Sequence, residues 1–108
     1  MVRLNTAPAP TAVLGVFRAL ADENRLRIIE VLREGERCVC DIQSSLDLGQ
    51  SLLSHHLGVL REAGLVRARR EGRWVHYALS DEVLSMAEAW LAETREASAL
   101  AYPRRSRC

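Results

Sequence analysis

The sequence predicts a mainly α-helical domain with a small β-hairpin, arranged as a winged helix-turn-helix of five helices plus a wing. Apolar residues recur at helical spacing along most of the chain, but the pattern changes to strict alternation over residues 66–79. The 108 residues suffice for one domain, and 48% hydrophobic with 27% charged residues is a globular composition.

Residues 1–10 are expected to form a disordered N-terminal arm, because Pro8 and Pro10 disfavour a helix and no apolar period is present. Thr11 is suited to cap a first helix over residues 12–20.

Asp22 predicts the N-cap of a second helix, which is expected to reach Arg33 and to end at Gly35. The apolar face predicted for this helix contains Leu26, Ile29 and Leu32, widened by Ile28 and Val31.

Two further helices are predicted over residues 38–46 and 51–63, joined by a tight turn at residues 47–50. The alternating stretch that follows forms two strands around Glu71-Gly72, which is the wing. A last helix covers residues 81–100. The domain therefore extends over residues 11–101, followed by a C-terminal tail at residues 102–108.

Charge is segregated along the chain although the net charge is only +1. Residues 61–77 contain five arginines and two glutamates, whereas residues 81–96 contain five acidic residues and one arginine. A basic patch next to an acidic helix indicates a nucleic-acid partner for one part of the surface.

The fourth helix has the pattern of a helix that reads the DNA major groove. Leu53, Leu57 and Leu60 form its buried stripe, which leaves small polar and amide side chains on the outer N-terminal side. The predicted DNA-binding residues are Gln50, Ser51, Ser54 and His55 on this helix, with Arg69, Arg70 and Arg73 on the wing. Each group alone is more often an ordinary solvated surface, and one of the neighbouring histidines can instead be a packing residue. Their order along the chain is what indicates DNA binding.

No apolar run of about 18 residues or more is present, which argues against a membrane span, and residues 1–10 lack the apolar core of a signal peptide. A cytoplasmic location follows. In that reducing compartment, the three cysteines are expected to be ligands or sensors rather than disulfides.

Cys38 and Cys40 are predicted to lie in the first turn of the third helix. Residues two apart on a helix point about 200° away from each other, so one ion can contact both sulfurs only if this turn loosens. A helix N-terminus loosens easily and favours thiolates, which prefer soft ions. Cys108 lies in the tail beside three arginines, which also favour its thiolate.

Four stretches, residues 20–29, 38–42, 51–66 and 71–77, resemble the ArsR/SmtB family of metal-sensing winged helix-turn-helix repressors. This resemblance implies a homodimer through the first and last helices, bound to an inverted-repeat operator in double-stranded DNA, with no role for a membrane.

The motif at residues 38–41, Cys-Val-Cys-Asp, matches the arsenite sensors of the family, which implies As(III) or Sb(III) as inducer, a role in arsenical resistance and no organic cofactor. The third cysteine of those sensors is missing, so Cys108 is the candidate third ligand beside Cys38 and Cys40. The family's zinc site on the last helix is also incomplete, since Val83 stands where a histidine is needed.

Cadmium and lead remain open as ions, and so does a redox or sulfane-sulfur sensor of the same fold that uses the same cysteines. An enzyme is disfavoured, because no acid–base set accompanies the cysteines.

Overall fold

The structure is a computed structural model that describes residues 10–101. Within this range it consists of five α-helices, one short 3₁₀ helix and three strands, which confirms a mainly helical winged helix-turn-helix. In chain order the elements are α1 Pro10–Leu20, α2 Glu23–Val31, η1 Leu32–Glu34, β1 Arg37–Cys38, α3 Val39–Leu46, α4 Gln50–Glu62, β2 Val66–Glu71, β3 Trp74–Leu79 and α5 Asp81–Leu100.

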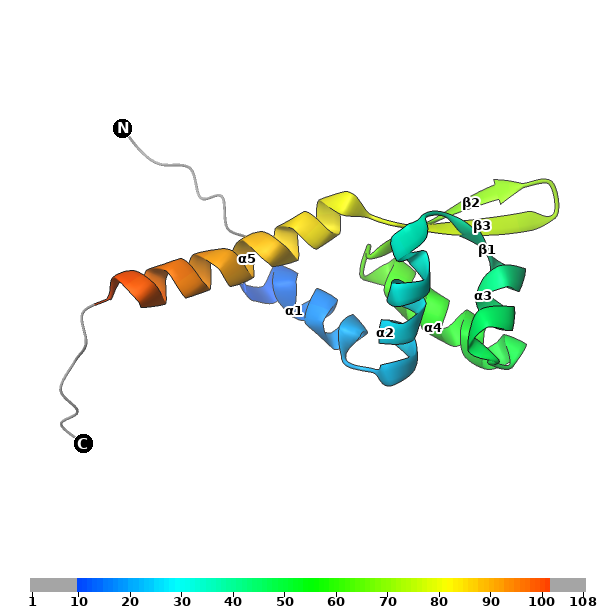
Figure 1. The fold of residues 1–108 in the computed structure, drawn as a ribbon, viewed down its shortest axis with the longest axis horizontal. Helices are drawn as coiled ribbons and strands as arrows, with labels where there is room; N and C mark the ends of the chain where they lie inside the picture. The colour runs from blue at the N-terminus through cyan, green and yellow to red at the C-terminus, as the bar shows by residue number, and fades with distance from the viewer. Residues whose placement is uncertain (1–9, 102–108) are drawn as a thin grey trace.

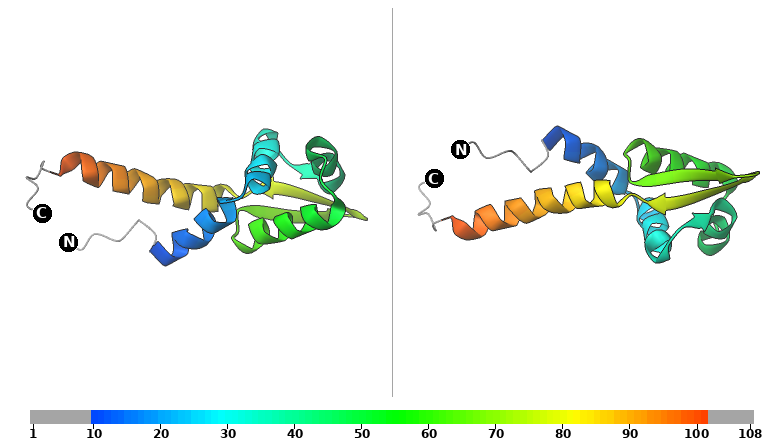
Figure 2. Two further views of the ribbon diagram at one scale, coloured as in Figure 1. Left: turned by 90° about the horizontal axis from the view of Figure 1, so that it is seen from below. Right: turned by 90° about the horizontal axis from the view of Figure 1, so that it is seen from above.

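The elements form two parts, which Figures 1 and 2 show from three sides. Helices α2, α3 and α4 gather around the sheet, and the β2–β3 hairpin extends from them as the wing. Helices α1 and α5 lie side by side and extend in the opposite direction. An edge-to-face contact between Phe17 and Trp90, with ring centroids 5.8 Å apart, joins these two helices.

Residue chemistry sets the helix ends that the sequence predicts. The Asp22 side chain accepts a hydrogen bond of 3.1 Å from the backbone N–H of Arg25 at the start of α2. Gly35 and Gly64 have φ angles of 124° and 78°, which glycine adopts at little cost. The first helix begins at Pro10, two residues before the predicted start, so Thr11 lies within α1 and is not its cap. Proline is tolerated at this first position, where its missing N–H is not needed.

A continuous core joins the helices to the sheet. Its fully buried members include Ile28, Leu32, Ile42, Leu53, Leu60 and Leu65. The predicted inner face of α2 needs a correction, because Leu26 is 47% exposed whereas Ile28 is 0% exposed. Helix α2 is therefore rotated so that Ile28, and not Leu26, points into the core.

The sheet has a third strand that the sequence pattern does not reveal. Strand β1 adds to the free edge of β3, so that the strand order is β1-β3-β2 and all neighbours are antiparallel. This strand contains Cys38, which is therefore not a residue of the third helix as predicted. Cys38 is the extended N-cap residue of α3 instead.

Candidate DNA interface and cysteine site

The predicted reading residues lie together on one exposed surface. Helix α4 begins at Gln50, one residue earlier than predicted, after Asp47 has turned the chain with a φ of 54°. The four predicted polar residues of this helix, Gln50, Ser51, Ser54 and His55, are all exposed. They occupy its first two turns, the end that a recognition helix directs at base edges.

The second histidine of α4 is a buried structural residue and not part of the exposed surface. His56 is 4% exposed, and its Nδ1 accepts a hydrogen bond of 3.1 Å from the Arg25 guanidinium. Arginine has only donors, so His56 is neutral with its proton on Nε2, which lies 3.9 Å from an Asp22 carboxylate oxygen. Burial, together with the nearby Arg25 and His55, lowers the pKa of His56, and Asp22 opposes this shift only in part.

Arg25 and Asp22 thus connect the start of α2 to the recognition helix. The Arg25 Nε donates a hydrogen bond of 2.6 Å to the backbone oxygen of Ala19 at the end of α1. The backbone N–H of Arg25 lowers the pKa of Asp22, and His56 adds to this effect. Residues 20–29, which resemble the family, therefore have a structural role, because Asp22 and Arg25 hold α1, α2 and α4 in one arrangement.

The wing presents its arginines unequally. Arg70 and Arg73 are exposed, and Arg73 lies with its guanidinium 5.3 Å from the centre of the Trp74 ring. Arg69 is engaged by carboxylates, with hydrogen bonds of 2.6 and 3.1 Å to Glu36 and an ion pair of 3.7 Å to Glu71. The sequence prediction grouped these arginines together, but only Arg70 and Arg73 have no carboxylate partner among residues 10–101.

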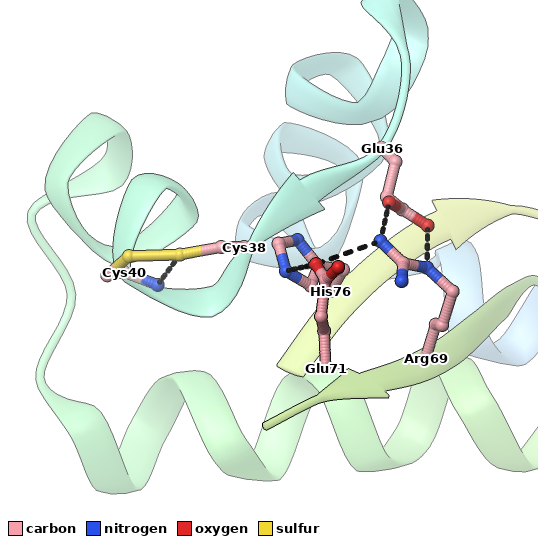
Figure 3. Close-up of polar contacts among 6 residues, drawn as sticks. All are labelled: Glu36, Cys38, Cys40, Arg69, Glu71 and His76. Atoms are coloured by element: carbon pink, nitrogen blue, oxygen red, sulfur yellow. Dashed lines mark hydrogen bonds and ion pairs between the residues drawn. A yellow bond between two sulfur atoms is a disulfide. The ribbon is translucent and has the colours of Figure 1, made fainter. Parts of the chain in front are cut away.

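Cys38 and Cys40 lie where β1 ends and α3 begins, with their Cα atoms 5.4 Å apart. The structure joins them in a disulfide (Figure 3), whereas the sequence favoured thiol ligands or sensors. The backbone N–H of Cys40 donates a hydrogen bond of 3.2 Å to the Cys38 sulfur. Because Cys38 precedes the helix, the two sulfurs approach each other without the loosened turn that was predicted.

Asp41 completes a group of donors that the sequence analysis did not consider. Its carboxylate oxygen and the two cysteine sulfurs all lie within 4.8 Å of one another, close enough to surround one ion once the cysteines are reduced. Cys40 and Asp41 are exposed, so an ion can reach the group from solvent. Cys108, the other predicted ligand, lies outside the described residues.

The remaining residue that sequence reasoning missed is Glu36. It precedes β1 and lies next to the wing, although 33 positions separate it from Arg69. No sequence pattern indicates a contact over that distance. The two side chains meet only because β1 and β2 pair with the two edges of β3, which brings Glu36 within reach of Arg69 across that strand.

Two helices joined by a short turn, an exposed polar recognition helix and a hairpin with arginines define a DNA-binding winged helix-turn-helix regulator. Residues 22–68 match the model of the family described as "Bacterial regulatory protein, arsR family". The chain belongs to the ArsR family.

The similarity extends over most of the length of known relatives and over a known structure. The arsenical resistance operon repressor of Escherichia coli strain K12 is 45% identical over 79% of this chain and 78% of its own length. A cadmium resistance transcriptional regulatory protein, the CadC homologue of Staphylococcus aureus, is 39% identical over 84% of this chain and 77% of its own. A crystal structure of an ArsR family transcriptional regulator superimposes with a TM-score of 0.80, at 29% identity, over 90% of this chain and 100% of its own.

Family membership decides whether the chain is a transcriptional regulator or an enzyme. The family and the relatives are DNA-binding transcriptional regulators, so the chain is a regulator and not an enzyme built on its cysteines. Across residues 10–101, none of the helices has the length and apolar content that a membrane crossing requires.

Proposed function

We propose that this chain is a homodimeric repressor that binds an inverted-repeat operator and releases it when arsenite or antimonite binds the thiolates of Cys38 and Cys40. The observation that carries the proposal is the position of the two sulfurs, which lie together at the N-terminus of α3, on either side of its first residue. Helix α3 is the first half of the helix-turn-helix. The E. coli relative, which shares 45% of aligned residues, is named a repressor of an arsenical resistance operon.

DNA recognition is assigned to two elements. The exposed residues at the start of α4, Gln50, Ser51, Ser54 and His55, enter the major groove and contact base edges and phosphates. Arg70 and Arg73 of the wing contact the phosphate backbone, and Arg69 joins them only when Glu36 and Glu71 release it.

Dimerisation through α1 and α5 explains their apolar surfaces. Leu14, Leu91 and Leu100 are 46%, 52% and 86% exposed, and a groove between the two helices is lined by Phe17 and Leu84 among others. A two-fold axis at these helices places two recognition helices about 34–36 Å apart, which is one turn of DNA. Such a dimer acts where the bacterial chromosome is, in the cytoplasm.

The donor set fits a soft, thiophilic ion, which thiolates bind in preference to hard cations. Trivalent arsenic prefers three sulfurs, and the described residues supply two, so Cys108 is assigned as the third ligand. The alternative third donor is the Asp41 carboxylate, which suits cadmium, the ion in the name of the S. aureus relative. X-ray absorption on the arsenite complex separates the two: Cys108→Ser lowers the count from three sulfurs to two, and Asp41→Asn leaves it at three.

Release follows from the short distance between the site and the recognition helix. Only residues 47–49 separate α3 from α4, so a change at the start of α3 shifts α4 relative to its partner across the dimer. The coupling required is small, because a 100-fold loss of DNA affinity corresponds to about 2.7 kcal/mol.

The experiment is a titration of fluorescence anisotropy on a DNA fragment selected for binding from a random-sequence pool. With the protein reduced, arsenite is expected to release the DNA from the unchanged protein and not from Cys38→Ser or Cys40→Ser. Both variants are expected to bind DNA as tightly as the parent. Ser44→Ala, another exposed position of α3, serves as the matched control and should respond like the parent. Release that persists in both cysteine variants would remove the pair from the mechanism.

The disulfide itself favours a second candidate function, a repressor that responds to oxidants through the same pair. Two thiols and one hydrogen peroxide give the disulfide and two waters, and the two electrons and two protons pass from the cysteines to the peroxide. Release by peroxide, reversed by dithiothreitol and accompanied by no response to arsenite, would favour this function over the first.

A further inference from the structure

The cysteine segment is connected to the wing as well as to the recognition helix. In the sheet, Cys38 is the register partner of His76 on β3, and His76 is the register partner of Arg69 on β2. Residues opposite one another on neighbouring strands share one face of a sheet. Cys38, His76 and Arg69 therefore form one row across all three strands.

A series of contacts between charged and polar side chains runs along the same face (Figure 3). The Glu36 carboxylate, two residues before Cys38, binds the Arg69 guanidinium with contacts of 2.6 and 3.1 Å. The Arg69 guanidinium lies 3.7 Å from the Glu71 carboxylate, which in turn lies 3.5 Å from the His76 ring. This series of contacts begins at Glu36, close to Cys38, passes through the wing, and ends at His76, the strand partner of Cys38.

The electrostatics agree with a close contact between Glu36 and Arg69. Arg69 lowers the pKa of Glu36 through their hydrogen bonds, and Glu36 raises the pKa of Arg69. The fork of the guanidinium meets both carboxylate oxygens, a two-point geometry that fixes orientation as well as distance. This geometry distinguishes the pair from the Glu34–Arg37 pair, which has a single contact of 3.4 Å within one segment.

We propose that Glu36 and Arg69 form a link that passes the state of the Cys38–Cys40 segment to the wing, so that ligand binding at the cysteines moves the wing as well as α4. The inference rests on the proposed function. While β1 lies along β3, Glu36 reaches Arg69, and the wing is held against the cysteine segment. The two sulfurs are bonded to each other in this structure, so an ion bound between the reduced sulfurs changes their separation. That change shifts the start of α3, and through Glu36 the position of the wing changes with it.

The size of the effect is bounded by the exposure of the pair. The side chains of Arg69 and Glu36 are 51% and 37% exposed, and water screens such pairs strongly. Loss of the link is therefore expected to reduce the response to ligand without abolishing it, by about threefold in each protomer.

The test compares the DNA affinity of each protein without and with arsenite, and takes the ratio. Glu36→Gln and Arg69→Gln should each lower this ratio by about threefold per protomer. The double variant should lower it no further, since both changes remove one contact. Glu34→Gln, which breaks an ion pair in the same segment that does not reach the wing, should leave the ratio unchanged. Additive losses in the double variant, or an equal loss in Glu34→Gln, would overturn the link.

A second measurement needs no DNA and separates the link from the proposed function. The NMR signal of the Arg69 Nε–H reports its hydrogen bond to Glu36, and it is followed in the reduced protein, with and without arsenite, and after oxidation of the cysteines by diamide. The signal should move when the state of the cysteines changes, and Glu36→Gln should remove that movement. A parent protein that keeps its DNA when arsenite is added refutes the proposed function alone. An Arg69 signal that is the same in all three states refutes the link alone.

Discussion

The three wing arginines should contribute unequally to DNA affinity, although the sequence presents them as one group. Arg70 and Arg73 have no carboxylate partner among residues 10–101, so a phosphate can take up their charge directly. Arg69 already shares its charge with Glu36 at 2.6 Å and with Glu71 at 3.7 Å. Arg73→Ala and Arg70→Ala are therefore expected to weaken binding to any DNA, and Arg69→Ala to have a smaller effect.

The magnitude follows from counterion release. Each neutralised phosphate contributes about −0.9 to the slope of log affinity against log salt concentration. The proposed dimer has two wings, so Arg73→Ala should reduce the steepness of this slope by about 0.9 per protomer and by about 1.8 in all. When salt rises from about 50 to about 200 mM, both proteins lose affinity, and the loss for the variant should be smaller than the loss for the parent by a factor of about 12. For Arg69→Ala the slope should stay close to that of the parent.

Fluorescence anisotropy at four or more salt concentrations, with selected and scrambled DNA, measures these slopes. Arg33→Ala is the control, because it removes an exposed arginine from η1, outside both α4 and the wing. Equal changes of slope in Arg69→Ala and Arg73→Ala would refute the unequal contribution of the two arginines. If Arg73→Ala weakens binding only to the selected DNA and leaves the slope unchanged, Arg73 reads bases instead of phosphates.

Three further predictions concern the rest of the interface and the fold. Ser54→Ala and His55→Ala should weaken binding to selected DNA by about 1–3 kcal/mol per contact and hardly change binding to scrambled DNA. The same anisotropy assay compares the two DNAs, and equal losses on both would place Ser54 and His55 outside the groove. Because burial lowers the pKa of His56, the unfolded state binds a proton more readily, so chemical denaturation should show stability falling as the pH drops below about 6.5. His56→Gln should flatten this dependence between pH 7.5 and 5, whereas His55→Gln should not, and an unchanged profile would contradict the assignment. Ile28→Ala should lower the free energy of unfolding by about 2–5 kcal/mol, whereas Leu26→Ala, at an exposed position, should lower it by less than about 0.5 kcal/mol. A larger loss for Leu26→Ala than for Ile28→Ala in chemical denaturation would support the inner face of α2 that the sequence predicted.

Helix ends were predictable because single residues determine them. Asp22 accepts a hydrogen bond from the backbone of α2, and Gly35 and Gly64 adopt positive φ angles, whatever the rest of the chain does. The exposure of the four polar residues at the start of α4 was predictable for a similar reason, since Leu53 and Leu57 fix which side of the helix faces the core.

Features that depend on tertiary contacts were not predictable. Strand β1 has only two residues, too few to show alternation, and it is extended because β3 offers a free edge. The same strand removes Cys38 from α3 and brings its sulfur to Cys40. The orientation of α2 likewise depends on the elements packed around it, which is why Ile28 and not Leu26 is buried.

The junction of β1 and α3 suits the proposed sensor because it is connected to both elements that are proposed to bind DNA. Along the chain it leads through α3 and the turn at residues 47–49 to the recognition helix, and across the sheet it leads through β3 to the wing. In the proposed dimer, a ligand at this junction disturbs two contacts with DNA in each protomer, and the two-fold symmetry doubles the number. A 100-fold loss of affinity then requires only tenfold from each protomer, or about 1.4 kcal/mol. This value lies within the range of about 1–3 kcal/mol that is typical of coupling between two sites, so the proposed response requires no unfolding of the helices that bind DNA.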